Sequence, residues 1–222
     1  RYGCINERKN QLHEGIRLSG MNIIINDVDR PLVIKVASIS AARMQVYFID
    51  NEDYFHRKQT FADESGKFFA DNDERAIFFA RGVLETVKKL RWAPDIIHCH
   101  GWISHILPIY LKKAYIDDPI FSGSKIVTSL YGDTPTMPFA PEFRELVKFG
   151  NITDADTAEP SGINLAKLAV RYSDGVIIGD GDVPAELTGF CASEGLPLLP
   201  FDASAMENGS YIDAYNRFYD SL

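Results

Sequence analysis

The sequence predicts an α/β fold with a mainly parallel sheet. Short β-branched runs alternate along the chain with longer segments whose apolar residues recur at helical spacing, the order typical of layered α/β domains. Two of the runs, 95–98 and 175–178, lack polar alternation, as expected of strands covered on both faces. The chain has 222 residues, of which 45% are hydrophobic and 12% aromatic, enough to bury the core of a single domain over 1–222.

The β-branched runs predict six strands, and each is bounded by turn-forming or helical sequence. They cover 21–25, 32–36, 45–49, 95–98, 125–130 and 175–178. The polar cluster at 26–31 is a turn signal, so we expect the first two strands to form a hairpin.

The clearest helix is predicted over 73–90, where six apolar residues share one face: Ala76, Phe79, Ala80, Val83, Val87 and Leu90. Asp71, followed three residues later by Glu74, resembles a capping box that starts this helix. Helical spacing predicts five more helices, at 102–115, 141–149, 163–172, 183–193 and 211–219.

Charge is spread unevenly along the chain. Residues 1–150 hold 20 Lys and Arg against 19 Asp and Glu, whereas residues 151–222 hold 3 against 12, within a net charge of −8. An acidic C-terminal third argues against a nucleic-acid partner, whose binding depends on basic contacts to phosphates. The ordinary role of such a charge run is a solvated face.

Composition also bears on location and metals. The sequence has no run near the roughly 18 apolar residues that a membrane-spanning helix needs, and its first residues lack the apolar core of a secretory signal. Cys4, Cys99 and Cys191 are widely spaced and odd in number, which fits neither a disulfide framework nor a zinc site. We therefore expect a cytoplasmic protein with no metal and no membrane partner.

In open parallel sheets the ligand-binding and catalytic residues lie at the carboxyl ends of the strands. That rule selects three segments: 98–102, 130–136 and 179–182. The last of these, G-D-G-D, lacks the signature of a phosphate loop and the ligand count of a calcium site, so a turn between strand and helix is the favoured interpretation.

Three stretches resemble the bacterial glycogen and starch synthases, the retaining glucosyltransferases of family 5. Residues 46–55, V-Y-F-I-D-N-E-D-Y-F, are similar to the family's V-Y-F-I-D-N-x-x-Y-F. Residues 71–79 and 92–102 resemble its D-N-x-x-R-F-x-x-F helix and the W-x-P-D-I-I-H-x-H-D-W strand that follows. Residues 165–176 resemble its L-K-x-G-x-x-Y-A-D-x-V segment, and order and spacing agree.

The resemblance implies a Rossmann-like N-terminal, acceptor-side domain, one half of a glycosyltransferase-B-type fold. Its first strand and helix are expected to be absent, because residues 1–3 resemble family sequence well after the K-x-G-G-L loop. The family's second domain binds the donor, ADP-glucose or UDP-glucose, and the family needs no other cofactor. The implied partners are an α-glucan acceptor and a donor-binding domain; an incomplete sheet edge makes a homodimer the other expectation.

Several positions depart from the family pattern. The H-D-W-H run appears at 100–103 as H-G-W-I, without the acid and the second histidine. The T-I-H-N motif appears at 128–131 as T-S-L-Y, so the histidine that contacts the transferred glucose becomes Leu130. The sequence therefore assigns no catalytic residue.

Five residues are candidates for glucan binding, and each has a structural alternative: His100, Trp102, Tyr131, Asp133 and Arg75. Trp102 could stack on a sugar or pack on the sheet, and Asp133 could bind hydroxyls or turn the chain. His98 alternates with His100 and is expected to be a hydrogen-bonded structural histidine. Arg75 could line the acceptor side within the helix that begins near Asp71.

Two main functions remain open at this point, besides a third and weaker alternative of a stand-alone small-molecule binder built on half the fold. One is α-1,4-glucan synthesis from a nucleotide-glucose donor with retention, completed by a donor domain. The other is a degenerate, non-catalytic domain that binds glucan or a partner in glycogen metabolism. The 222 residues alone are predicted to be inactive, because the parts that hold the diphosphate are not among them.

Overall fold

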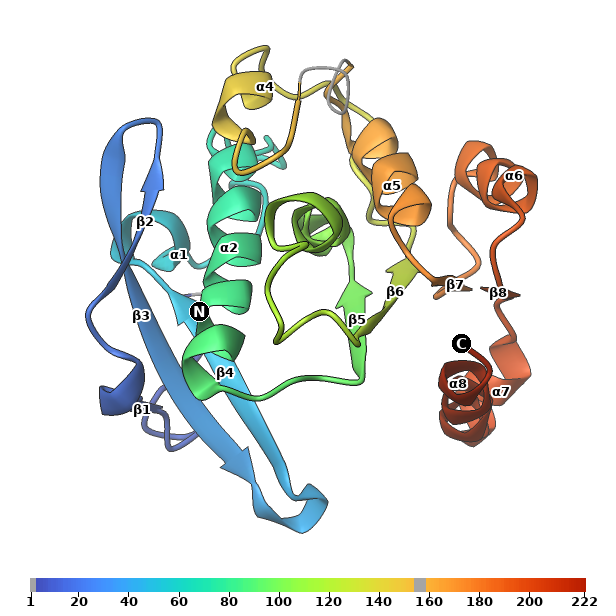
Figure 1. Ribbon diagram of the computed structural model, residues 1–222, viewed down its shortest axis with the longest axis horizontal. Helices are drawn as coiled ribbons and strands as arrows, with labels where there is room; N and C mark the ends of the chain where they lie inside the picture. The colour runs from blue at the N-terminus through green and yellow to red at the C-terminus, as the bar shows by residue number, and fades with distance from the viewer. Residues whose placement is uncertain (1–2, 154–158) are drawn as a thin grey trace. The chain divides into compact units, whose positions relative to one another are not determined.

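The computed structural model describes residues 3–153 and 159–222. The chain divides into two compact units, Arg1–Trp92 and Ala93–Leu222. Each unit is described by itself, and the single domain over 1–222 stays a prediction. The α/β fold with a parallel sheet is confirmed, and the parallel sheet belongs to the second unit (Figure 1).

The first unit is built on an antiparallel sheet. Its strands are β1 (His13–Glu14), β2 (Met21–Ile25), β3 (Val28–Ile39) and β4 (Met44–Asp50), with short 3₁₀ turns at Ile16–Leu18 and Ser40–Ala42. The long β3 pairs with each of the other three. The predicted hairpin is confirmed, and its turn is Asn26–Asp27, both at positive φ, as a two-residue hairpin requires.

Two helices complete this unit: α1 (Glu52–Phe55) and α2 (Asn72–Leu90). The Asn51 side chain caps α1 by accepting hydrogen bonds from the backbone N–H groups of Asp53 and Tyr54. The predicted capping box of α2 is wrong. The Asp71 carboxylate is taken by the Arg57 guanidinium at 2.5–2.7 Å, and Glu74 accepts a hydrogen bond from the Tyr54 hydroxyl at 2.6 Å.

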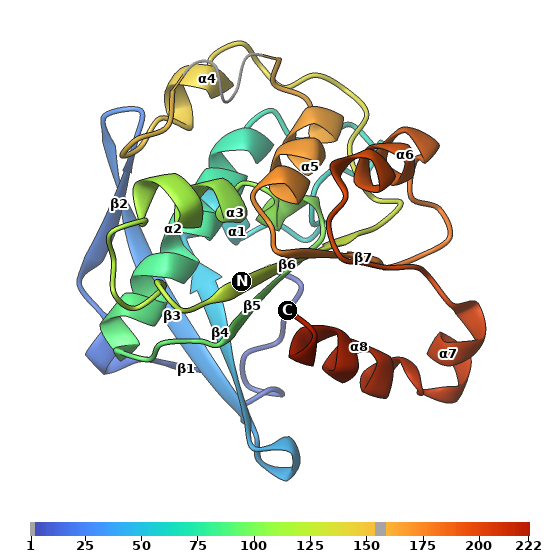
Figure 2. The ribbon, with the colours of Figure 1, turned by 45° about the vertical axis from the view of Figure 1, so that its right-hand side comes forward.

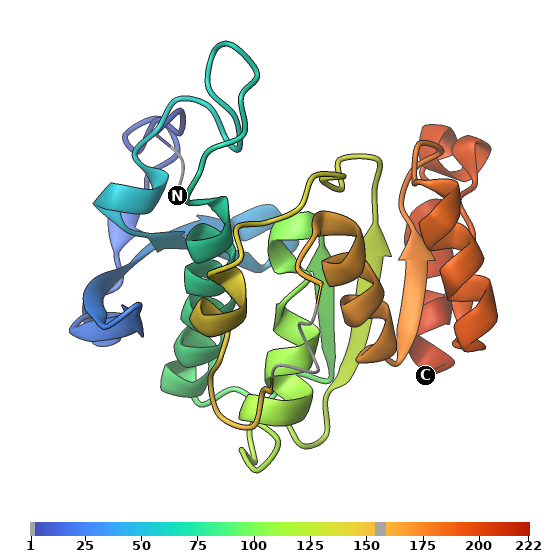
Figure 3. The ribbon, with the colours of Figure 1, turned by 90° about the horizontal axis from the view of Figure 1, so that it is seen from above.

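The second unit has a parallel sheet in the order β5–β6–β7–β8, formed by β5 (Ile96–His100), β6 (Lys125–Leu130), β7 (Gly175–Ile178) and β8 (Leu198–Leu199). Figure 3 shows β5, β6 and β7 side by side, coloured green to orange. The helices of this unit include α4 (Phe143–Leu146), α5 (Gly162–Arg171), α6 (Ala185–Glu194), α7 (Ala203–Asn208) and α8 (Tyr211–Asp220).

The helix predicted over 102–115 is broken into three short pieces. A 3₁₀ turn covers Trp102–Ser104, α3 covers Leu107–Ile109, and a π-helical turn covers Tyr110–Ala114. Pro108 lies at the start of α3, and because proline has no N–H it cannot continue the hydrogen-bond ladder of the preceding turn. Helix α4 is likewise shorter than predicted.

Helices cover both faces of the parallel sheet (Figure 2). On one face, α5 and α6 bury Leu130 and Val176 with Ala166, Val170 and Leu187. On the other face, α8 packs Phe218 against Val127 and Ile177, with Tyr215 and Tyr219 beside them. These two layers explain why β7 carries no polar alternation.

Candidate functional site

The carboxyl ends of β5, β6 and β7 lie next to one another because the strands are parallel. The register pairs His100 with Ser129 and Leu130 with Ile178. Side chains from the segments at 98–102, 130–136 and 179–182 therefore come together at one edge of the sheet, as the strand-end rule predicts.

His98 lies within this edge as a hydrogen-bonded residue. Its Nδ1 atom is 2.6 Å from the Tyr219 hydroxyl and its Nε2 atom is 2.6 Å from the Ser129 hydroxyl. Burial, followed by the neighbouring charge of His100, lowers the pKa of His98 to about 3. The ring is therefore neutral, and one of its nitrogens donates while the other accepts. Its expected structural role agrees with these contacts.

His100 and Tyr131 are brought together at the exposed end of the edge. The His100 Nδ1 atom is 2.7 Å from the Tyr131 hydroxyl, and the two rings stack with centroids 6.1 Å apart. The His100 ring also lies against the ring of His98, with centroids 3.8 Å apart. Burial lowers the pKa of His100, so it too favours the neutral form. A hydroxyl and an imidazole thus face solvent in fixed positions.

Asp133 lies beside them, and its carboxyl group has a raised pKa. Burial, together with the negative charge of Asp180, raises the pKa of Asp133. Asp180 is itself held by the Gly132 N–H, which donates to both carboxylate oxygens at 2.9–3.0 Å. Two carboxylates from adjacent strand ends therefore give this edge a negative potential that favours hydroxyl donors over anions.

Gly101 explains how Asp133 reaches the site. Its φ of 73° is a backbone conformation that residues with side chains rarely adopt, and a Cβ atom there would lie 3.6 Å from the Asp133 Oδ2 atom. The family's acid at this position would be strained in this backbone. A carboxylate from the next strand end occupies the neighbourhood instead.

Two of the five residues predicted to bind glucan are buried in the structure, Trp102 and Arg75. Trp102 is 1% exposed, and its ring packs at 6.2 Å from that of Phe139, so it is a core residue and offers no face to a sugar. Arg75 belongs to the first unit and is fully buried. Its Nε donates to the Tyr54 carbonyl oxygen at 2.8 Å, and its guanidinium lies over the ring of Phe55.

Leu130, at the position of the family's histidine, has a purely structural environment. It is fully buried in the apolar cluster beneath α5 and α6. Two residues of the edge were not predicted from the sequence, namely Ser129 and Tyr219. The i, i+4 spacing of Tyr215 and Tyr219 in the predicted last helix was the signal that they share a face.

Over 3–153 and 159–222, no group of three or more His, Cys, Asp and Glu side chains could hold a metal ion. Within those same ranges, none of the helices combines the length and the apolar character needed to cross a membrane.

The sequence is similar to those of starch and glycogen synthases. A family model described as "Starch synthase catalytic domain" matches residues 1–195. A "Glycogen synthase" of Chlorobium limicola is 42% identical over 132 residues, covering 59% of this chain and 27% of that protein. A "Glycogen synthase" of Chlorobaculum parvum is 33% identical over 175 residues, covering 78% and 36%.

A solved structure agrees in fold. The "Catalytic domain of Starch Synthase IV from Arabidopsis thaliana bound to ADP and acarbose" superposes with a TM-score of 0.68 at 14% identity, over 90% of this chain and 42% of that one. The chain thus spans less than half the length of each of these three proteins.

Proposed function

The chain belongs to the family of starch synthase catalytic domains, and we propose that it binds α-glucan on the acceptor side and does not by itself transfer glucose. The observation that carries the proposal is the burial of Leu130, where the family has its histidine. A fully buried leucine can neither contact the transferred glucose nor hydrogen bond to it.

The charge of the strand-end edge supports glucan over nucleotide sugar as the ligand. A diphosphate needs cations or helix N-termini, whereas this edge presents Asp133 and Asp180. A glucan is neutral and rich in hydroxyl groups, and these donate strong hydrogen bonds to carboxylate oxygens. His100 and Tyr131 add two further polar groups whose positions are fixed by their mutual hydrogen bond.

Maltoheptaose titrated into the protein, followed by calorimetry, tests this proposal. Saturable binding is expected. Asp133→Asn should weaken it about tenfold or more, because hydrogen bonds to charged groups contribute about 1.5–3 kcal/mol. His100→Ala should weaken it about 2- to 12-fold. Glu142→Gln, at an exposed acid beside α4, is the matched control. Absence of binding by the unaltered protein would contradict the proposal.

A second candidate function is retaining α-1,4-glucan synthesis from ADP-glucose or UDP-glucose, shared with a donor-binding domain. It is favoured by the names of the relatives and by the fraction of their length that this chain spans. Adding a separately produced donor domain of a relative to the chain would test it. Glucosyl transfer that depends on both components would support this candidate over simple binding.

A further inference from the structure

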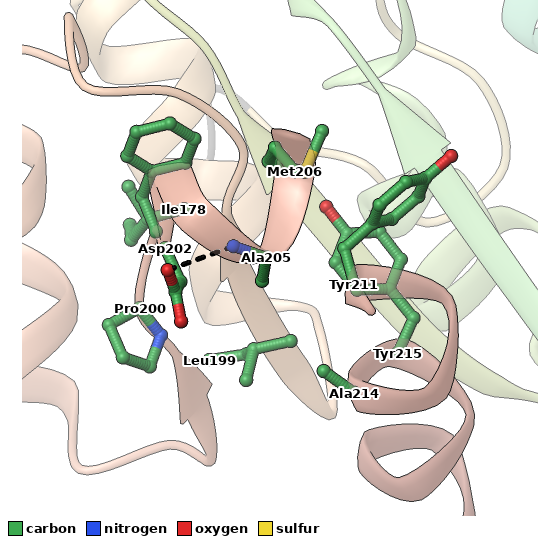
Figure 4. Close-up of a pocket in the computed structure, with 10 residues that line it drawn as sticks. Ile178, Leu199, Pro200, Asp202, Ala205, Met206, Tyr211, Ala214 and Tyr215 are labelled. Carbon is green, nitrogen blue, oxygen red and sulfur yellow. Dashed lines mark hydrogen bonds between the residues drawn. The ribbon is translucent and has the colours of Figure 1, made fainter. Parts of the chain in front are cut away.

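A pocket of about 160 Å³ opens at the carboxyl ends of β7 and β8 (Figure 4). Ile178 and Leu199, the last residues of these strands, line it together with Met206 of α7 and Tyr211 and Tyr215 of α8. Most of its lining comes from residues beyond 195, which lie outside the part of the chain that the family model matches. The pocket is therefore not one of the features by which the family is identified.

The pocket offers aromatic surface together with hydroxyl groups. Tyr211 and Tyr215 lie one helical turn apart on α8, with ring centroids 5.5 Å apart and planes at 77°. Figure 4 shows both tyrosines on one side of the pocket and Pro200 and Asp202 on the other. Neither tyrosine is fully buried. Aromatic faces beside hydroxyls suit a ligand that has both apolar and hydroxylated surfaces.

Charge narrows the chemical class of this ligand. Among the described residues that line the pocket, Asp202 is charged and none is Lys, Arg or His. Asp202 caps α7 by accepting hydrogen bonds from the Ala205 N–H at 3.1 Å and the Ser204 hydroxyl at 3.2 Å. Residues 151–222 as a whole carry 12 acids against 3 bases. A phosphate or nucleotide would be repelled, whereas a neutral ligand would not.

The pocket adjoins the strand-end edge described above. Tyr131 lies against Gly179, where a Cβ atom would be 2.3 Å from the tyrosine ring, so the ring borders the residue that follows Ile178. Burial, followed by the neighbouring Tyr131 hydroxyl, raises the pKa of Tyr215. A ligand that extends from Tyr131 past Gly179 would therefore reach the pocket.

We propose that this pocket binds one glucosyl unit of an α-glucan whose neighbouring units lie on the edge formed by His100, Tyr131 and Asp133. The apolar face of the sugar ring packs on Tyr211 and Tyr215, and its hydroxyl groups bond to theirs. This inference rests on the proposed function, because a glucan is the neutral polyhydroxylated ligand that the edge would bind.

Two pocket variants test the inference by opposite means. Tyr211→Ala removes an aromatic face, and Ala205→Trp fills the pocket with a bulky side chain while leaving both tyrosines in place. Ile212→Ala is the matched control, because Ile212 is the neighbouring residue of α8, is 55% exposed and does not line the pocket. Each protein is titrated with maltoheptaose, and a thermal melt reports whether it is folded.

Both pocket variants are expected to bind maltoheptaose about 2- to 12-fold more weakly, the range that aromatic stacking provides. The control should bind like the unaltered protein. If only one pocket variant folds, the affinity of that variant for maltoheptaose decides whether the pocket binds the glucan. Unchanged affinity in the folded pocket variants, with His100→Ala still weakened, would overturn the pocket and leave the proposed function standing. Failure of the unaltered protein to bind would overturn both, and equal weakening in the control would overturn the pocket.

Discussion

The Nδ1 atom of His98 lies 2.6 Å from the hydroxyl of Tyr219, although the two residues are 121 positions apart in the chain. The bond joins the strand β5 to the last helix, α8. Because Ser129 bonds to the other ring nitrogen, the imidazole is satisfied on both sides. The C-terminal helix therefore completes the polar network of this sheet face as well as its apolar packing.

Tyr219→Phe should remove this bond and keep the ring packing. The free energy of unfolding is expected to fall by about 0.5–1.5 kcal/mol, the usual net contribution of one hydrogen bond. Urea unfolding of the two proteins measures the difference. Asn216→Ala, at an exposed position of the same helix, is the control and should change little. Equal stability of Tyr219→Phe and the unaltered protein would show that the bond contributes nothing.

The histidines should make the protein sensitive to acid. The pKa of His98 falls from 6.5 to about 3 and that of fully buried His105 falls from 6.5 to about 4, in both cases chiefly through burial. Between these values and 6.5 the unfolded chain binds protons that the folded chain does not. The free energy of unfolding therefore rises with pH in this window. The contribution of the two histidines to it is fully present above pH 6.5 and is lost as the pH falls toward 4.

Nuclear magnetic resonance of the imidazole rings checks this mechanism directly. In the folded protein at pH 5 the rings of His98 and His105 should be neutral, and in concentrated urea the same rings should be protonated. Each such proton contributes a slope of at most about 1.4 kcal/mol per pH unit. Protonated rings in the folded protein at pH 5 would contradict the assignment.

The two tryptophans should differ sharply in accessibility. Trp102 is 1% exposed and Trp92 is 61% exposed. Acrylamide should quench the fluorescence of Trp92 in Trp102→Phe and scarcely affect that of Trp102 in Trp92→Phe. Trp102→Ala should destabilise the protein by about 3–5 kcal/mol, whereas Trp92→Ala should have little effect. Strong quenching of Trp102 would return it to the role of an exposed sugar platform.

Much of the fold could be predicted from local patterns. The strands at 21–25, 125–130 and 175–178 match β2, β6 and β7 residue for residue, because β-branched runs bounded by turn signals indicate strands. The two-residue β8 and the helix α7 were not predicted, because segments so short carry no period. The helix over 102–115 was wrong because the effect of Pro108 outweighs the apolar spacing around it.

The site was harder to predict than the fold. Strand order places His100, Tyr131 and Asp133 at one edge, which the strand-end rule anticipates. The burial of Trp102 and Arg75 could not be decided from the sequence, since it depends on tertiary packing around Phe139 in one case and Phe55 in the other. Tyr219 was missed because its partner His98 is distant in sequence.

Leu130→His, which restores the family's histidine, should not restore glucosyl transfer. The new imidazole would be buried among Ala166, Val170 and Val176, where an unbonded polar group costs about 1–3 kcal/mol. Urea unfolding should show this loss, and Leu130→Met, which preserves volume and apolar character, should lose less. A Leu130→His protein as stable as the original, with measurable glucosyl transfer, would mean that the apolar cluster tolerates a working site.

Co-sedimentation with glycogen in the presence of radiolabelled ADP-glucose tests binding without transfer most directly. After ultracentrifugation we expect the 222-residue protein in the glycogen pellet, with less of it there for Asp133→Asn. We expect radiolabel in the pellet to be no higher than in a protein-free control. Protein that stays in the supernatant would contradict glucan binding. Label that enters the pellet in proportion to the protein added would contradict the absence of glucosyl transfer.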